Sequence, residues 1–321
     1  MEGTFVHSFG SSSRIARQDA SQFHHHVMNS IHAHDAPTFE EVHTARRGLL
    51  LYFGVVLLIS IPLLYLIISA GTPIEQQLEY IIPLMWTPAI ASVVARLGNG
   101  EGFEDLSFRL RRREVVVRVL QAILFPFGVG AIAYGAAWGV GLVEFAAPAG
   151  TSDPLSAFAG DLLFAATIGA VVGVISAAGE EIGWRGYMTS RLITAGVPAP
   201  ILTGGVLWGC WHVPAILTGQ YAAGRSRILS AVLFVVVAVS LTVLWSAWTL
   251  ETGSIWPAIL GHSAWNAVIQ GPFDAFSSGA LATTWVGESG LLVVAATIIV
   301  VVVFTSDRVT NRLGSLSSPS H

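Results

Sequence analysis

Apolar residues recur along the chain in long runs, and they do not alternate with polar residues. From Gly48 onward the runs approach the ~20 residues that a helix needs to cross a hydrocarbon core ~30 Å thick. The alternating ten-residue segments that are typical of a transmembrane β-barrel are absent from the sequence. The pattern therefore predicts an all-α polytopic membrane protein with about eight transmembrane helices, at about 48–69, 80–97, 115–143, 157–180, 199–217, 229–250, 254–270 and 288–305.

Two of these spans depart from the simple pattern. The third is long enough to tilt or to break near Pro126. The seventh is short and polar for a span, which indicates that protein rather than lipid surrounds it.

The composition agrees with a membrane protein. Hydrophobic residues make up 53% of the chain and charged residues only 11%, against ~25% charged in ordinary soluble chains. This difference excludes a single soluble domain, and it also excludes disorder of the whole chain. The formal charge of −4 does not fit a nucleic-acid partner. The single cysteine, Cys210, excludes an internal disulfide and any CxxC metal or redox motif.

Residues 1–44 form a polar, His-rich and aperiodic stretch. It lacks the 7–15-residue apolar segment of a cleavable signal peptide. Its histidines would bind a metal only loosely, because nothing around them fixes their geometry, so we expect a disordered tail; they include His24, His25, His26, His32 and His34. A transmembrane domain is expected over 45–310 and a C-terminal tail over 311–321.

The arginines predict the orientation of the chain in the membrane. If there are eight spans, ten arginines fall in connections on one side and only two on the other. The larger group is Arg46, Arg47, Arg109, Arg111, Arg112, Arg113, Arg185, Arg191, Arg308 and Arg312, and the smaller is Arg225 and Arg227. Because positive residues stay on the cytoplasmic side, we expect a cell-membrane protein with both termini in the cytoplasm.

Ionisable side chains within spans are costly, so they are the first candidates for function. The segment GEEIGWRGY places Glu181 and Arg185 at i and i+4, where they can pair on one face of a helix. Glu180 is turned ~100° away and is left free as a general base. The alternative is a pair of carboxylates solvated at a helix end.

Two further clusters lie in later spans. Trp208 and His212 are one helical turn apart, and so are His262 and Asn266. An asparagine donates a hydrogen bond without carrying charge, which suits the stabilisation of an oxyanion. The alternative for both clusters is simple hydrogen bonding between helices.

A polar cavity open to the cytoplasm would gather these side chains. His262 is expected ~12 Å into the seventh span and Glu180 at the cytoplasmic end of the fourth. His212 is expected ~20 Å into the fifth, so the three predicted depths disagree.

At these residues the chain resembles the CPBP family, which includes CAAX-type prenyl endopeptidases and the Abi immunity proteins. The matches are Glu180-Glu181-xxx-Arg185, Trp208-xxx-His212 and His262-xxx-Asn266, in that order, within about 155–305. One departure is Trp208, where a phenylalanine is commoner.

The resemblance implies an intramembrane CAAX-type endopeptidase, a glutamate protease of a family also classed as metalloprotease-like. By analogy, Glu180 and His212 would activate water, while His262 and Asn266 would bind the oxyanion. Arg185 would hold Glu181 in place. The substrate would be a peptide or protein, with or without a lipid anchor, in contact with membrane lipid.

Three alternatives remain open at this point. The first is a non-enzymatic immunity or binding protein of the same fold. The second is a transporter, although the two corresponding halves with broken helices that mark many transporters are not evident. The third keeps the hydrolysis but uses zinc held by Glu180, His212 and His262. We expect no metal, because the HExxH helix is absent. In addition, neither histidine motif contains a carboxylate that could hydrogen-bond the other ring nitrogen of a zinc-bound histidine.

Overall fold

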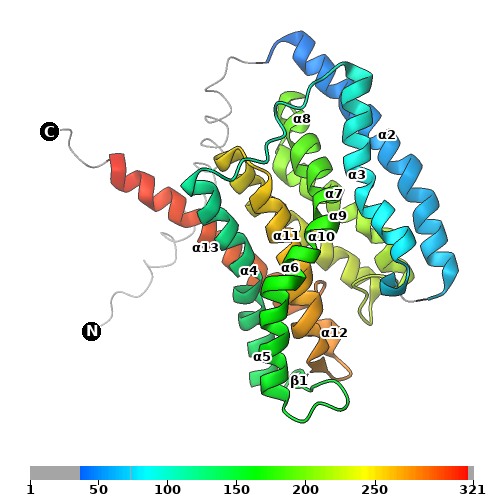
Figure 1. Ribbon diagram of the computed structural model, residues 1–321, viewed down its shortest axis with the longest axis vertical. Helices are drawn as coiled ribbons and strands as arrows, with labels where there is room; N and C mark the ends of the chain where they lie inside the picture. Colours follow the sequence, from blue (N-terminus) through cyan, green and yellow to red (C-terminus); the bar gives the residue numbers. More distant parts are fainter. Residues whose placement is uncertain (1–36, 73, 317–321) are drawn as a thin grey trace, which may run out of the picture. The chain divides into compact units, whose positions relative to one another are not determined.

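The computed structural model describes residues 37–72 and 74–316 of the chain. The long helices are α2 (Phe39–Ala70), α3 (Leu78–Asn99), α4 (Arg113–Gly139), α9 (Pro200–Thr218), α10 (Arg227–Thr252), α11 (Trp256–Val268) and α13 (Leu291–Leu316) (Figure 1). Between α4 and α9 the chain forms α5 (Pro154–Phe164), η2 (Ala165–Gly169), α6 (Ala170–Val172), α7 (Val174–Gly183), η3 (Trp184–Met188) and α8 (Thr189–Thr194). The short elements are η1 (Ile74–Gln76), η4 (Ile269–Phe273) and α12 (Ala282–Trp285).

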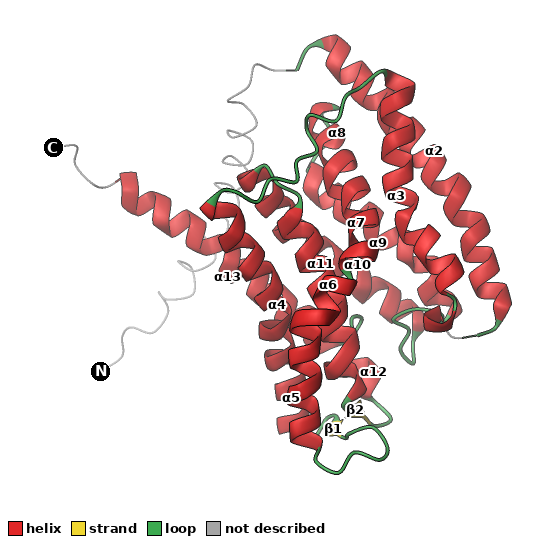
Figure 2. Ribbon diagram, in the orientation of Figure 1, coloured by secondary structure: helices red, strands yellow, loops and turns green. Residues whose placement is uncertain are grey.

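The all-α prediction is confirmed. Within residues 37–72 and 74–316, the only strands are β1 (Glu144–Phe145) and β2 (Ser277–Ser278), which form one short antiparallel pair (Figure 2). In the described part of the chain, six helical segments are long and apolar enough to cross a membrane: α2, α3, α4, the segment Pro154–Val172, α9 and α10. The chain is therefore a multi-pass membrane protein, while the count of eight spans stays a prediction.

Three local expectations change. Helix α2 begins at Phe39, so residues 39–44 are helical and do not belong to a disordered tail; the five histidines from His24 to His34 lie outside the described residues. Helix α4 continues through Pro126 without a break. Helix α13 runs on to Leu316, into the segment that was expected to be the C-terminal tail.

The fourth span is much longer than predicted. Between Pro154 and Thr194 the chain is helical except for one turn at Gly173, and the path includes the two π-helical segments η2 and η3. Glu180 therefore lies near the middle of this path and not at its end. The buried pair of Glu181 with Arg185 explains the continuation, because a charged segment with a paired carboxylate can stay inside the bundle.

Small residues allow α7 to lie directly against α3. A Cβ atom at Gly179 would come 2.7 Å from the carbonyl oxygen of Met85, and one at Gly183 would come 2.3 Å from Pro88. The two glycines are four residues apart, which is the spacing that brings membrane helices into close contact. Because Glu180 sits between them, the contact fixes its position along the bundle axis.

Polar contacts join the connections at one end of the bundle, which we call the arginine end: the start of α2 and residues 100–112, 195–199 and 253–255. Arg191 on α8 contacts Glu101 and, at 2.8 Å, Asp105. Arg96 on α3 also contacts Asp105, at 2.6 Å. The opposite end, which we call the cavity end, contains residues 71–77, 219–226 and 274–290 (Figure 1).

Candidate active site

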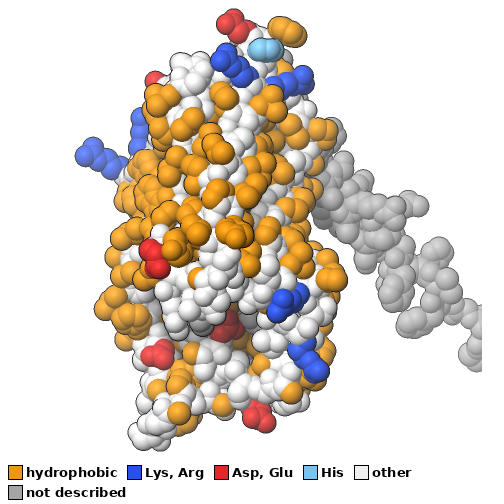
Figure 3. Space-filling view, turned by 90° about the vertical axis from the view of Figure 1, so that its right-hand side faces the viewer, with side chains coloured by type: hydrophobic (Ala, Val, Ile, Leu, Met, Phe, Trp, Pro, Cys, Tyr) orange, Lys and Arg blue, Asp and Glu red, His pale blue; other side chains and the backbone are white. Residues whose placement is uncertain are grey.

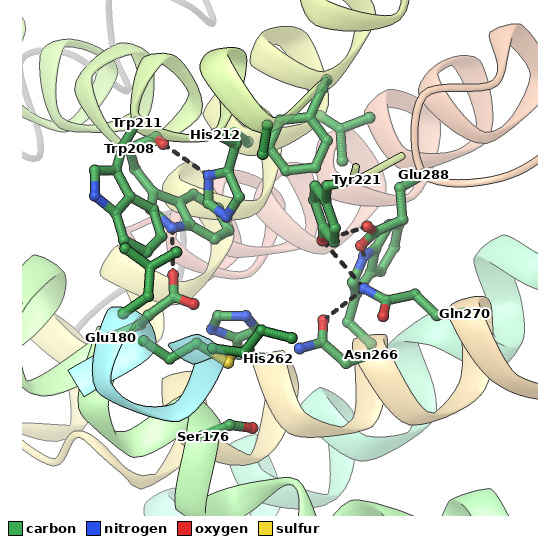
Figure 4. A pocket seen from close by; sticks show the side chains of 18 of the residues that line it. Ser176, Glu180, Trp208, Trp211, His212, Tyr221, His262, Asn266, Gln270 and Glu288 are labelled. Carbon is green, nitrogen blue, oxygen red and sulfur yellow. Dashed lines mark hydrogen bonds between the residues drawn. The ribbon is translucent and has the colours of Figure 1, made fainter. Parts of the chain in front are cut away.

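One cavity of about 310 Å³ contains the predicted catalytic residues. Helices α2, α3, α7, α9, α10 and α11 contribute to its wall. Most of the wall is apolar, and the polar or indole-bearing side chains gather on a few helices; they are Ser176, Glu180, Trp208, Trp211, His212, Tyr221, His262, Asn266, Gln270 and Glu288 (Figure 4). An apolar pocket with a few convergent polar groups is the usual form of a small-molecule or peptide site.

Glu180 is the deepest carboxylate of the cavity wall, with 1% of its surface exposed. The indole Nε1 of Trp208 donates a hydrogen bond of 2.8 Å to its Oε2 atom. Among the described residues no other donor contacts this carboxylate, so Oε1 remains available toward the cavity. The prediction that Glu180 is the uncommitted member of the pair agrees with this arrangement.

His212 lies beside Glu180 on the neighbouring helix α9. Its Nδ1 atom is 3.0 Å from the carbonyl oxygen of Trp208. Because a carbonyl oxygen only accepts, Nδ1 carries the proton, and the Nε2 atom of the neutral ring is an acceptor. Glu180 and His212 line the same cavity, so the predicted difference in depth does not separate them.

Glu181 contacts two other residues of the site, Arg185 and His262. Its Oε1 atom accepts a hydrogen bond of 2.8 Å from Nη1 of Arg185, which confirms the predicted i, i+4 pair. The same oxygen lies 2.8 Å from Nδ1 of His262 on α11. Sequence reasoning missed this contact, because spacing along the chain does not reveal neighbours on different spans. The contact with Glu181 engages Nδ1 of His262, so the Nε2 atom of the same ring is left free.

Arg185 is held on both sides of its guanidinium group. Nη2 donates a hydrogen bond of 2.9 Å to the hydroxyl of Thr242, and Cζ lies 4.2 Å from the ring centre of Trp208. Both Nη atoms are therefore paired within the wall, whereas Nε is buried without a partner among the described residues, and Arg185 does not line the cavity itself.

Asn266 occupies the next turn of α11 after His262. Its Oδ1 atom lies 3.4 Å from Nε2 of Gln270, a contact that assigns the amide orientation from the hydrogen-bond network. The Nδ2 group of Asn266 then points toward His262 (Figure 4). Two potential donors, the amide of Asn266 and the imidazole of His262, face the same part of the cavity.

Four polar residues of the wall were not predicted: Ser176, Tyr221, Gln270 and Glu288. Glu288 is 5% exposed, and its two oxygens accept hydrogen bonds from Nε1 of Trp265, at 2.6 Å, and from the hydroxyl of Tyr221. Gln270 donates to the same hydroxyl at 3.1 Å. The one available signal was the position of Glu288 at the first residue of the last predicted span.

The cavity reaches the cavity end of the bundle. Its wall includes Ile74, Tyr221 and Glu288 from the connections at that end, and no residue of the arginine-end connections. Figure 3 shows a hollow in the lower half of the face over α2 and α3, with an acidic side chain inside it. The expected cytoplasmic opening and the expected cytoplasmic position of the arginines therefore cannot both hold in this fold.

The zinc alternative is not decided by the contacts of these side chains. Among the described residues no three His, Cys, Asp or Glu side chains gather in a way that could hold a metal. The contacts with Trp208 and Glu181 engage Oε2 of Glu180 and Nδ1 of His262, and they leave the other oxygen and Nε2 free. The expectation of a metal-free site therefore stays a prediction.

A comparison with protein families identifies part of the chain. Residues 161–268 match the family model described as type II CAAX prenyl endopeptidase Rce1-like. The matched segment begins in α5, ends with α11 and contains all three motifs. A search of curated proteins gave no match. Over residues 161–268 the chain is therefore similar to the Rce1-like CAAX prenyl endopeptidases, which supports its resemblance to the CPBP family.

Proposed function

We propose that this protein is an intramembrane endopeptidase of the CAAX type, in which Glu180 and His212 activate water for hydrolysis of a peptide bond. The observation that carries the proposal is the division of one cavity into two halves. One half presents acceptors, the Oε1 atom of Glu180 and the Nε2 atom of His212. The other half presents the donors of Asn266 and His262.

The two halves match the requirements of amide hydrolysis. Water gives a proton to Glu180 while its oxygen adds to the carbonyl carbon of the substrate. The resulting oxyanion accepts a hydrogen bond from Nδ2 of Asn266, and a second one from Nε2–H of His262 when the imidazole is protonated. Glu181 stabilises that imidazolium through Nδ1. The carbon–nitrogen bond then breaks, and the proton passes from Glu180, directly or through His212, to the leaving amine.

The proposal does not include a metal. Carboxylate and imidazole account for each proton transfer, so no step of the proposal needs a metal. Purified enzyme should keep its activity after treatment with phenanthroline. Loss of activity on chelation, with recovery when zinc is returned, would favour the alternative in which Glu180, His212 and His262 are ligands.

We further propose that the protein lies in the cell membrane with both termini in the cytoplasm, because the arginine end carries most of the positive charge. Its partners would be membrane lipid and a peptide or protein substrate, with or without a lipid anchor, and no nucleic acid.

The activity can be tested by exchanging one atom. Glu180→Gln keeps an oxygen that can accept from Trp208 but removes the base, so peptide cleavage should fall by about 10²–10⁴-fold. Mass spectrometry of membrane-derived peptides should detect termini that depend on wild-type protein and vanish with the variant. Glu79→Gln is the matched control, because Glu79 is exposed at the start of α3. Identical peptides from wild type and Glu180→Gln would leave the non-enzymatic binding protein as the better reading.

A further inference from the structure

Glu288 is a buried carboxylate that the proposed mechanism does not use. It lies on the cavity wall, it is 5% exposed, and it comes from the connection between α12 and α13. Both of its described donors are neutral groups, the indole of Trp265 and the hydroxyl of Tyr221. In the described part of the chain no arginine or histidine forms an ion pair with it. Its negative charge is therefore not balanced by a protein cation in contact.

A carboxylate has about four acceptor positions, and only two of them are used at Glu288. Burying a charge without a partner is expensive, since water is excluded and the hydrogen bonds of neutral donors compensate only in part. A glutamine would be a poorer partner, because its amide would donate to the hydroxyl of Tyr221, which already accepts from Gln270 and would lose its own acceptor. The two unused acceptor positions of the carboxylate lie at the cavity wall, where a cationic donor can reach them.

Glu288 lies close to the proposed reaction centre. A chain of hydrogen bonds joins Asn266 to Gln270, Gln270 to Tyr221 and Tyr221 to Glu288 (Figure 4). Such a chain is comparable in length to about two residues of an extended peptide, ~7 Å. A peptide whose carbonyl oxygen contacts Asn266 can thus bring a neighbouring side chain to Glu288.

We propose that Glu288 forms a subsite for a lysine or arginine side chain of the substrate, within about two residues of the bond that is cut. The position of the subsite relative to the cleaved bond rests on the proposed function. The cation subsite itself rests only on Glu288 and the cavity that it lines. The hydrophobic wall binds the rest of the peptide, and Glu288 determines which charge is accepted.

Binding can be measured without turnover by using the Glu180→Gln protein in detergent. The probes are three acetylated and amidated heptapeptides of leucine and alanine, with lysine, norleucine or glutamate at the centre. We expect the lysine peptide to bind about tenfold more tightly than the norleucine peptide, and the glutamate peptide to bind least. Adding Glu288→Gln should remove the preference for lysine, while adding Glu79→Gln should leave it unchanged. Equal binding of the lysine and norleucine peptides would overturn the inference.

Cleavage gives a second, separate readout. A randomised peptide library treated with the wild-type enzyme should yield products enriched in lysine or arginine within two residues of the cut, and Glu288→Gln should abolish this enrichment while neutral peptides are still cleaved. Cleavage without basic enrichment would contradict the subsite and leave the protease intact. Selective binding of the lysine peptide without any cleavage would instead contradict the proposed function and support the subsite.

Discussion

At the scale of single residues, the second motif of this chain has a tryptophan, Trp208, at a position where a phenylalanine is commoner. Its indole Nε1 donates to Glu180, and its carbonyl oxygen accepts from His212. A phenylalanine would keep the carbonyl contact and the ring, but it has no donor for the carboxylate. Trp208 is therefore a positioning residue for the proposed base.

Trp208→Phe should lower kcat by about tenfold and change KM little, because a hydrogen bond to a charged group is lost at the base while the apolar wall is kept. Steady-state kinetics with a cleaved library peptide would measure this. Trp211→Phe is the matched control, since the indole of Trp211 donates to Ser60 and not to Glu180. Equal losses in both variants would point to packing of the aromatic wall rather than to the base.

The sequence allowed some site residues to be predicted and not others, for a physical reason. Glu181 and Arg185 are neighbours along one helix, so the i, i+4 rule identifies their pair. The contact between Glu181 and His262 joins two helices far apart in the chain, and no local rule contains it. Glu288 and Tyr221 come from connections, where a single polar residue is ordinary and carries no signal by itself.

At the scale of elements, the apolar pattern predicts where helices lie better than where they end. The rule of ~20 residues per span ended the fourth span at residue 180. The structure continues it to Thr194, because the charges of Glu181 and Arg185 are paired and because Gly179 and Gly183 fit against α3. A hydropathy pattern interprets these charged residues as the end of a span. Their tertiary contacts instead keep them buried inside the helix bundle.

Ion pairs join the connection between α3 and α4 to α8, and the stabilisation that they give should depend on pH. Partial burial opposes ionisation of Asp105, but Arg96 and Arg191 outweigh it and hold the pKa of Asp105 below its ordinary value. Since the folded-state pKa is the lower one, this stabilisation is present above the ordinary pKa of ~3.9 and is lost as the pH falls through the folded value.

Asp105→Asn should therefore lower the melting temperature at neutral pH, and the difference from wild type should shrink below about pH 4. Thermal unfolding in detergent between pH 3 and 7 measures both effects. Glu104→Gln provides a neighbouring control, because this exposed carboxylate makes no ion pair in the described structure. A difference that stays constant over the whole range would mean that Asp105 acts through packing and not through its charge.

At the scale of the whole molecule, the arginines and the cavity lie at opposite ends of the same helices. The connection 100–112 carries three arginines, and hydrogen bonds join it to the beginning of α11 and, through Arg191, to α8. The cavity is lined from the other end, by Ile74, Tyr221 and Glu288. If the arginine end is cytoplasmic, substrates reach Glu180 from the outer face or from the bilayer, and not from the cytoplasm.

Thiol labelling in intact cells can decide between these arrangements. Cys210 is the only cysteine of the chain, so Cys210→Ala provides a background without thiols. In that background, Ala223→Cys places a thiol at the cavity end and Glu104→Cys places one at the arginine end. A membrane-impermeant maleimide should label Ala223→Cys in intact cells, and Glu104→Cys only after permeabilisation, because a cytoplasmic arginine end is shielded by the membrane. The reverse pattern would show that the cavity opens to the cytoplasm and that local contacts of the arginines, such as those of Arg191 with Glu101 and Asp105, cancel the charge on which the orientation rule depends.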